Sequence, residues 1–212
     1  MTDYDARRAQ MVKRQLRARG IDDERVLAAM EATPREAFVP PGRRSQAYAD
    51  SALSIGSEQT ISQPWIVAAI AQALQLSGDE RVLEIGTGSG YSTHVLSLLA
   101  AEVISVERHR ELADSAREVL TSLGTEGVEL LVGDGSGGVP DRAPFEAIAV
   151  HATAPAPPPA LLEQLAEGGR MVIPIASESI DTLTLLRRRG AGVEVTSLGP
   201  CRFVPLIGEA GF

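Results

Sequence analysis

The chain has 212 residues, of which 44% are hydrophobic and 23% charged, a composition typical of one globular domain and not of a disordered chain. Twenty Lys and Arg residues against 28 Asp and Glu residues give a net charge of -8, which argues against a protein that mainly grips nucleic-acid phosphates or an anionic membrane. One cysteine and three scattered histidines predict neither an internal disulfide nor a metal site. Because the N-terminus is charged and no apolar run approaches the ~18 residues of a membrane span, we expect a cytoplasmic protein.

The first part of the chain is expected to be helical. Apolar residues at helical spacing indicate an initial helix, and Asp22 or Asp23 is placed to cap a second, short one. Residues 34–60 read as irregular chain. Ser62 is expected to cap a third helix, which Gly78 ends.

After residue 80, strand and helix patterns alternate. Short apolar runs predict strands at 81–85, 102–106, 128–132, 145–150, 171–173, 182–186 and 193–198, and amphipathic stretches predict helices at 91–99, 112–123 and 161–165. This alternation indicates an α/β fold with a doubly wound, mostly parallel sheet. Because no helix separates the last two strands, we expect an antiparallel C-terminal edge. We divide the single domain, residues 1–212, into an N-terminal helical extension (1–77), a ligand-binding core (78–176) and C-terminal strands (177–212).

A glycine-rich loop is the most informative segment of the sequence. Gly86, Gly88 and Gly90 follow a predicted strand and precede a predicted helix, where glycine permits positive φ or lets a ligand touch the backbone. A dinucleotide fingerprint would need a glycine at the position of Tyr91, and no Lys-Ser/Thr pair indicates a phosphate loop. The loop therefore suits a nucleoside-like ligand without pyrophosphate. The alternative is a tight turn that binds nothing.

Two acidic residues follow the next strands. Glu107 closes the second strand of the core, 21 residues after Gly86, where an acidic side chain accepts hydrogen bonds from ribose hydroxyls. Asp134, between Gly133 and Gly135, closes the third strand, where a carboxylate can meet an adenine amino group. Three successive strand ends therefore offer polar groups to one crevice, although Glu107 could also be a solvated strand end.

With these segments in view, the sequence resembles the class I S-adenosylmethionine-dependent methyltransferases and, more closely, the protein-L-isoaspartate O-methyltransferase family. The resemblance covers nearly the whole chain. It is carried by segments at residues 9–16, 34–39, 59–64, 82–91, 133–135, 143–145, 168–174 and 202–206. The glycine loop identifies only the cofactor class, whereas Thr60-Ile-Ser-Gln-Pro64 and Arg202-Phe-Val-Pro-Leu206 indicate the family.

The resemblance implies a Rossmann-like class I methyltransferase fold and a cofactor, S-adenosyl-L-methionine, which leaves as S-adenosyl-L-homocysteine. It assigns residues of the three strand ends to this cofactor. The methionine end would be held by Glu84, Gly86, Gly88 and Gly90, the ribose by Glu107, and the adenine side by Asp134 and Gly135.

The resemblance also implies a reaction. The family methylates the free α-carboxylate of L-isoaspartyl residues in damaged proteins and peptides, and the ester then collapses to a succinimide, which begins repair. Thr60, Ile61 and Ser62 would line the methyl-transfer site, with Ser62 orienting the acceptor, and Phe203, Val204 and Pro205 would hold the substrate main chain. An isoaspartyl carboxylate, with a pKa near ~4, is already anionic at pH 7 and needs no general base. We expect a monomer whose partners are isoaspartyl-containing proteins, without nucleic acid or membrane.

Alternatives stay open where the chain departs from the family pattern. Ser54, Trp65 and the loop 136–139 suit a carboxyl methyltransferase for a dedicated peptide or small molecule, and a non-catalytic cofactor-binding protein is a third reading. Ser62 could be only a helix N-cap. Trp65 could pack in the core or form the pocket wall, and His151 could be structural or reach the site.

Overall fold

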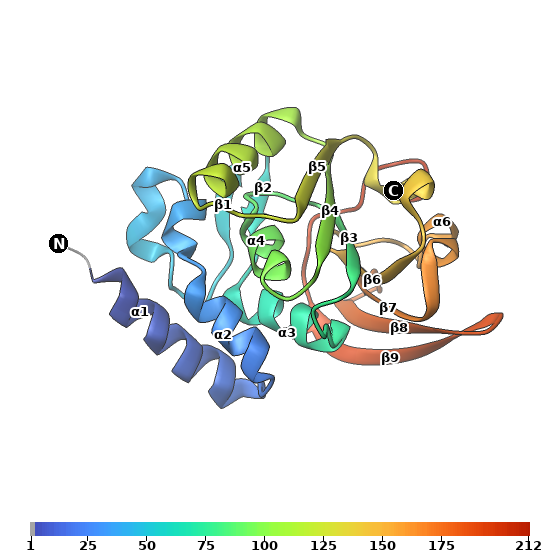
Figure 1. Cartoon of the computed structure of the whole chain (residues 1–212), viewed down its shortest axis with the longest axis horizontal. Coiled ribbons are helices and arrows are strands. Elements are labelled where there is room, and N and C mark those ends of the chain that lie inside the picture. Colours follow the sequence, from blue (N-terminus) through green and yellow to red (C-terminus); the bar gives the residue numbers. More distant parts are fainter. Residues whose placement is uncertain (1–2) are drawn as a thin grey trace.

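A seven-stranded sheet, with strand order β5-β4-β3-β6-β7-β8-β9, forms the centre of the protein in a computed structural model that describes residues 3–212 (Figure 1). The strands are β3 (Arg81–Ile85), β4 (Glu102–Glu107), β5 (Val128–Val132), β6 (Phe145–Val150), β7 (Leu165–Ile175), β8 (Asp181–Arg189) and β9 (Gly192–Cys201). Strands β3 to β7 pair in parallel, whereas β7, β8 and β9 pair antiparallel. The predicted parallel sheet with an antiparallel C-terminal edge is therefore confirmed.

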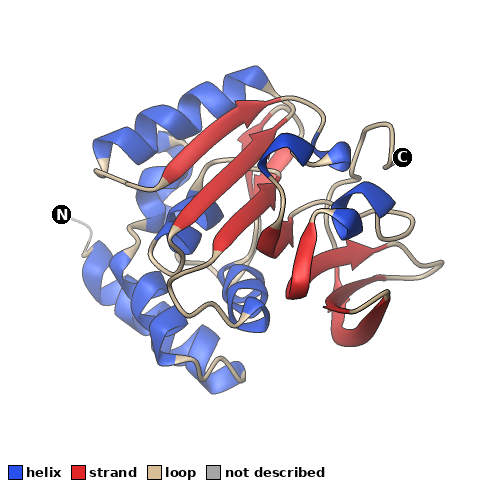
Figure 2. Ribbon diagram, turned by 45° about the vertical axis from the view of Figure 1, so that its right-hand side comes forward, coloured by secondary structure: helices blue, strands red, loops and turns tan. Residues whose placement is uncertain are grey.

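The helices gather mainly on one side of this sheet (Figure 2). On that side lie α3 (Pro64–Leu74), α4 (Tyr91–Ser97) and α5 (Arg110–Ser122), whose apolar residues share one buried core with Val82, Val103 and Ala147 of the sheet. The alternate residues of the strands, such as Leu83 and Ile104, form a second core with the short helix α6 (Pro159–Glu163). This division follows from the strand geometry, in which successive side chains point to opposite faces.

The N-terminal segment is helical, as predicted. Helix α1 (Tyr4–Met11) continues through a π-helical turn and a 3-10 turn that ends at Gly20, whose φ is 90°. Helix α2 (Glu24–Ala32) is capped by Asp23, whose carboxylate accepts hydrogen bonds from two backbone N–H groups of the first turn. Met30 and other buried residues of these helices belong to the same core as α3. The division of the chain at residues 77 and 176 stays a prediction.

Residues 34–60 are not irregular, which corrects the prediction. They contain 3-10 helices at Arg35–Phe38 and Pro41–Gln46 and a hairpin of β1 (Leu53–Gly56) and β2 (Gln59–Ile61). The turn residues Ser57 and Glu58 both have positive φ, 48° and 57°. Hairpin turns of this kind normally carry Asn or Gly at these two positions, so the only turn signal in the sequence was the preceding Gly56, whose φ is also positive.

Two element boundaries also differ from the predictions. Gln63 occupies the N-cap position of α3, without a side-chain hydrogen bond, and Pro64 begins the helix. Ser62 is therefore not the N-cap. Strand β7 has 11 residues and includes Gly168 and Gly169, whereas the sequence pattern predicts a break at these glycines before a short strand at 171–173. A register irregularity in its pairing with β6 accommodates this glycine pair.

Glu80 closes the turn that leads into β3. Its carboxylate accepts hydrogen bonds from the Ser77 hydroxyl at 2.7 Å and from the backbone N–H groups of Ser77 and Gly78 at 2.9 Å. Desolvation works to raise the pKa of Glu80, but these hydrogen bonds lower it to about 2. The turn therefore depends on an ionised Glu80. Within residues 3–212, the structure has no helix that is long and apolar enough to cross a membrane.

Candidate active site

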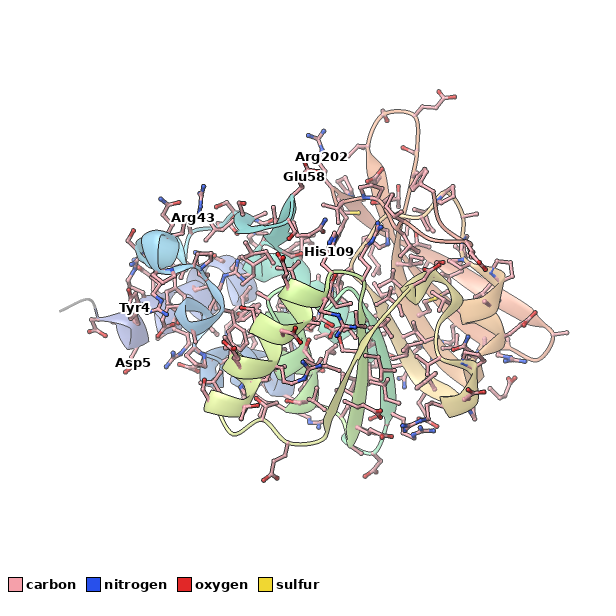
Figure 3. All side chains as sticks on the ribbon, turned by 90° about the horizontal axis from the view of Figure 1, so that it is seen from above. Tyr4, Asp5, Arg43, Glu58, His109 and Arg202 are labelled. Atoms are coloured by element: carbon pink, nitrogen blue, oxygen red, sulfur yellow. The ribbon has the colours of Figure 1, made fainter. Side chains whose placement is uncertain are left out.

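A cavity of about 600 Å³ opens at the carboxyl ends of the central strands. Its walls come mainly from the glycine loop after β3, the hairpin and the residues that follow it (57–67), and the C-terminal segment 200–207. The ends of β4 and β6 and the loop after β5 contribute further residues, among them Glu107, His151 and Gly135. Figure 3 shows Glu58 on the hairpin turn and Arg202 on the C-terminal segment at the same rim, with His109 nearby, and all three residues line the cavity. The carboxyl edge of a parallel sheet is where such folds bind ligands.

The glycine loop meets the cavity through two of its three glycines. Gly86 and Gly88 line it and have φ of 93° and 55°, a conformation that other residues rarely adopt. Gly90 does not line the cavity. A Cβ at Gly90 would lie 3.2 Å from the Cβ of Ala116 on α5, so this glycine allows the helix to pack against the loop. The structure therefore gives no support to the predicted cofactor contact of Gly90.

Glu107 is a fixed carboxylate in the cavity wall and not a solvated strand end. It is only 4% exposed. One oxygen accepts a hydrogen bond from the N–H of Gly88 and the other from the N–H of His109, both at 2.9 Å. Each oxygen keeps one lone pair. The residue therefore meets the requirement for accepting two neighbouring hydroxyl groups.

The loop after β5 places two neighbouring residues, Asp134 and Gly135, in different surroundings. Gly135 lines the cavity, and a Cβ there would lie 2.6 Å from a methyl carbon of Ile85. Asp134 is exposed and outside the cavity lining. Its oxygens accept hydrogen bonds from the N–H groups of Ser136, at 2.8 Å, and Glu209, at 2.9 Å. Burial works to raise the pKa of Asp134, but these bonds bring it below the ordinary value. Asp134 thus fastens the C-terminal segment to this loop, and its adenine contact stays a prediction.

Glu84, a predicted cofactor residue, lies behind the cavity wall. It is fully buried, and one oxygen accepts hydrogen bonds from the hydroxyls of Thr93, at 2.5 Å, and Ser105, at 2.6 Å. The other oxygen lies 3.1 Å from Nε2 of His151, which also lies 2.9 Å from Oγ of Ser92. His151 and Ser92 line the cavity. Sequence reasoning left the role of His151 open and missed Ser92, for which only its place just after the glycine loop offered a signal.

The predicted acceptor residues Thr60, Ile61 and Ser62 all line the cavity. Their backbone is held from below by Arg35, which is 0% exposed. Arg35 donates hydrogen bonds to the carbonyl of Ser62 at 2.8 Å and to that of Ala47 at 2.7 Å. Burial lowers the pKa of this guanidinium. Nothing in the sequence signals a buried arginine here, because Arg35 stands in a short, polar segment.

Phe203, Val204 and Pro205 also line the cavity, and their predicted role in holding the substrate main chain stays a prediction. This segment docks onto Thr153, just beyond β6. The Thr153 N–H donates to the carbonyl of Val204 at 2.8 Å, and the Leu206 N–H donates to the carbonyl of Thr153 at 2.7 Å. The N–H groups of Phe203 and Val204 make no hydrogen bond among the described residues, so they are available to a bound main chain.

Trp65 lines the cavity and also packs against the hydrophobic core, so the structure supports both of its readings. Its indole N–H donates to the carbonyl of Arg19 at 3.2 Å, and the Arg19 guanidinium lies 4.9 Å from the ring centre. Cys201 also lines the cavity, but it is buried, and burial raises the pKa of its thiol to about 11. A thiol with so high a pKa is a poor nucleophile at neutral pH.

Comparisons with known proteins agree along the whole chain. The profile of the family described as protein-L-isoaspartate(D-aspartate) O-methyltransferase matches residues 6–211. The protein-L-isoaspartate O-methyltransferase of Koribacter versatilis is 50% identical over 212 residues, which cover 100% of this chain and 96% of the relative. That of Methanoculleus marisnigri is 50% identical over 205 residues, covering 97% and 93%.

Solved structures match the fold equally well. A protein-L-isoaspartate O-methyltransferase superposes with a TM-score of 0.85 at 30% identity, covering 96% of this chain and 67% of the solved one. A Plasmodium falciparum structure described as the same kind of enzyme, in complex with S-adenosyl-L-homocysteine, superposes with a TM-score of 0.82 at 23% identity, covering 98% and 99%. At that identity the second likeness concerns the fold alone.

Proposed function

This chain belongs to the protein-L-isoaspartate(D-aspartate) O-methyltransferase family, and we propose how its own residues perform the family's reaction. The enzyme transfers a methyl group from S-adenosyl-L-methionine to the free α-carboxylate of L-isoaspartyl residues in proteins and peptides. The ester then closes to a succinimide, and repair begins. The observation that carries this function is 50% identity to such enzymes over 97–100% of the chain.

The hydrogen-bonding groups and the open space in the cavity match the parts of the cofactor. When bound, S-adenosyl-L-methionine supplies an electrophilic methyl group on a sulfonium centre. Gly86 and Gly88 let its methionine part approach the backbone, and the two free lone pairs of Glu107 accept the ribose hydroxyls. Gly135, where any side chain would strike Ile85, leaves room on the adenine side, with Asp134 beside it. Glu84 and Gly90 support the site from behind its wall.

The acceptor binds between the hairpin side and the C-terminal segment. Ser62 donates its hydroxyl hydrogen to one carboxylate oxygen, while Thr60 and Ile61 flank it. The free N–H groups of Phe203 and Val204 hold the substrate main chain, with Pro205 next to them. Because these contacts use backbone groups, the enzyme accepts isoaspartyl residues in many sequence settings.

No proton needs to be removed before the methyl group moves. The acceptor carboxylate is ionised at neutral pH, and its negative charge and the positive charge of the donor both disappear as the carbon–oxygen bond forms and the carbon–sulfur bond breaks. Rate enhancement therefore comes from holding the two groups in line and from keeping water out of the cavity. Ser62 contributes to the alignment of the two groups, and Trp65 contributes to the exclusion of water.

The setting of the enzyme follows from its charge and composition. We propose a cytoplasmic monomer that acts on isoaspartyl-containing proteins without help from nucleic acid or membrane. The net charge of -8 supports this, because it opposes binding to phosphate-rich surfaces.

A methyl-transfer assay tests the function directly. Purified protein receives S-adenosyl-L-methionine with a labelled methyl group and either an isoaspartyl peptide or its twin with a normal aspartyl residue. We expect base-labile label in the isoaspartyl peptide only. Equal labelling of both peptides, or labelling of neither, would contradict the proposed acceptor.

A further inference from the structure

A cluster of polar side chains at the cavity wall includes two residues, His151 and Ser92, that have no role in the mechanism above. Its third member is Glu84. The carboxylate of Glu84 is 0% exposed and the imidazole of His151 only 7%. Apart from the His151 ring, Oε1 of Glu84 has no hydrogen-bonding atom near it among the described residues. A buried carboxylate oxygen requires a donor, so the ring must supply one.

The position of Glu84 decides which nitrogen of His151 carries a hydrogen. Nε2 lies 3.1 Å from Oε1 of Glu84 and 2.9 Å from Oγ of Ser92. If Nε2 were unprotonated, its lone pair would face a carboxylate oxygen at close range. Nε2 therefore carries a hydrogen that faces both Oε1 of Glu84 and Oγ of Ser92. Because a protonated Nε2 has no lone pair, the Ser92 hydroxyl cannot donate to it.

This assignment leaves the hydroxyl hydrogen of Ser92 unused. Ser92 is half-buried and lines the cavity, and its Oγ makes no other hydrogen bond within residues 3–212. A hydroxyl whose oxygen is already held is ready to donate to a ligand without reorganising first. The cluster is thus a donor directed toward the occupant of the cavity.

We propose that Ser92 is a cofactor-positioning residue whose hydroxyl donates to the α-carboxylate of the methionine part of S-adenosyl-L-methionine, and that His151 and Glu84 hold it in that role. The proposal rests on the proposed binding of the methionine part at Gly86 and Gly88. Of the polar groups in that part of the cofactor, the carboxylate alone accepts hydrogen bonds, because the ammonium group donates and the sulfonium sulfur is cationic.

The neighbourhood of Ser92 favours the cofactor over the peptide acceptor. Ser92 follows the glycine loop directly, and Cβ of His151 lies 3.4 Å from the point where a Cβ on Gly86 would stand. Ser62, in contrast, belongs to the other wall. Substitution of Ser92 is therefore expected to weaken cofactor binding and to leave the KM for the peptide nearly unchanged.

Calorimetry with two ligands tests the proposal without turnover. S-adenosyl-L-homocysteine carries the carboxylate, whereas 5′-methylthioadenosine lacks the whole amino-acid part. We expect Ser92→Ala to weaken binding of the first by about 10- to 100-fold, as for one lost hydrogen bond to a charged group, and to leave binding of the second, measured by competition, unchanged. Ser97→Ala is the matched control, since this hydroxyl lies on the same helix but donates to the backbone carbonyl of His94 and does not line the cavity.

Variants at His151 separate positioning from folding. His151→Gln keeps a donor near the place of Nε2 and should retain most of the affinity for S-adenosyl-L-homocysteine. His151→Leu should lose as much as Ser92→Ala, and the double variant should lose little more. Equal weakening of both ligands by Ser92→Ala would indicate a structural role, and unchanged binding of both would refute the contact. A raised peptide KM with unchanged cofactor affinity would assign Ser92 to the acceptor. Failure of the unaltered enzyme to bind S-adenosyl-L-homocysteine would instead refute the proposed function.

Discussion

Substitution of Ser62 by alanine separates a role in catalysis from a role in folding. The Ser62 hydroxyl lines the cavity and has no hydrogen-bond partner among the described residues, and the N-cap position of α3 belongs to Gln63. An N-cap serine would lose about 0.5–2 kcal/mol of stability on change to alanine, whereas we expect almost no loss here. The lost hydrogen bond to the acceptor carboxylate should cost roughly 2–3 kcal/mol of transition-state stabilisation, which corresponds to a fall of about 30- to 160-fold in kcat/KM.

The two quantities are measured side by side. Urea unfolding gives the stability of each protein, and methyl transfer to an isoaspartyl peptide gives kcat/KM. Calorimetry with S-adenosyl-L-homocysteine should show unchanged cofactor affinity, since Ser62 acts on the acceptor. A stability loss of about 1 kcal/mol with unaltered kcat/KM would restore the N-cap reading and refute the assignment of Ser62.

Three further predictions concern stability. The folded-state pKa of Glu80 is about 2, against an ordinary value of 4.5, so the contribution of this carboxylate to stability is fully present above pH 4.5 and is lost as the pH falls through 2. Glu80→Gln should lower the free energy of unfolding by up to about 3 kcal/mol at pH 7. Urea unfolding at pH 3 should show a smaller difference in stability between the variant and the unaltered protein. Gly135→Ala places a Cβ 2.6 Å from Ile85 and should cost about 1–3 kcal/mol, while Gly133→Ala, which meets nothing within 4 Å, should be nearly neutral in the same assay. Arg35→Lys keeps the charge but loses the two-point hydrogen bonding, so thermal unfolding should show a loss of about 2 kcal/mol or more, with a lower kcat/KM; an unchanged melting temperature would contradict the holding role.

The parallel core could be predicted from the sequence because its signals are local. The strands at 81–85, 128–132 and 145–150 match to the residue, since each is a short apolar run with polar or glycine punctuation. The hairpin β1–β2 could not be found in this way. Its strands have four and three residues, and its turn forces positive φ on Ser57 and Glu58, so its conformation depends on the surrounding structure.

The candidate site shows the same limit. Gly86, Gly88 and Glu107 reach the cavity because strand ends in a parallel sheet meet at one edge. Glu84 and Asp134 stand at such ends too, yet their side chains are engaged elsewhere, and their partners include Thr93, 9 positions away, and Glu209, 75 positions away. Contacts of that range leave no trace in a local pattern, which is also why Arg35 and Ser92 escaped notice.

The two ligand-binding walls of the cavity have different architectural origins. The side that we propose for the methyl donor is built on the ends of the core strands, which pair with one another in the sheet. The acceptor side consists of a small hairpin and a C-terminal segment, both outside the parallel strands. A substitution in the hairpin or the C-terminal segment should therefore change the proposed acceptor wall while leaving in place the strand ends that we propose hold the methyl donor.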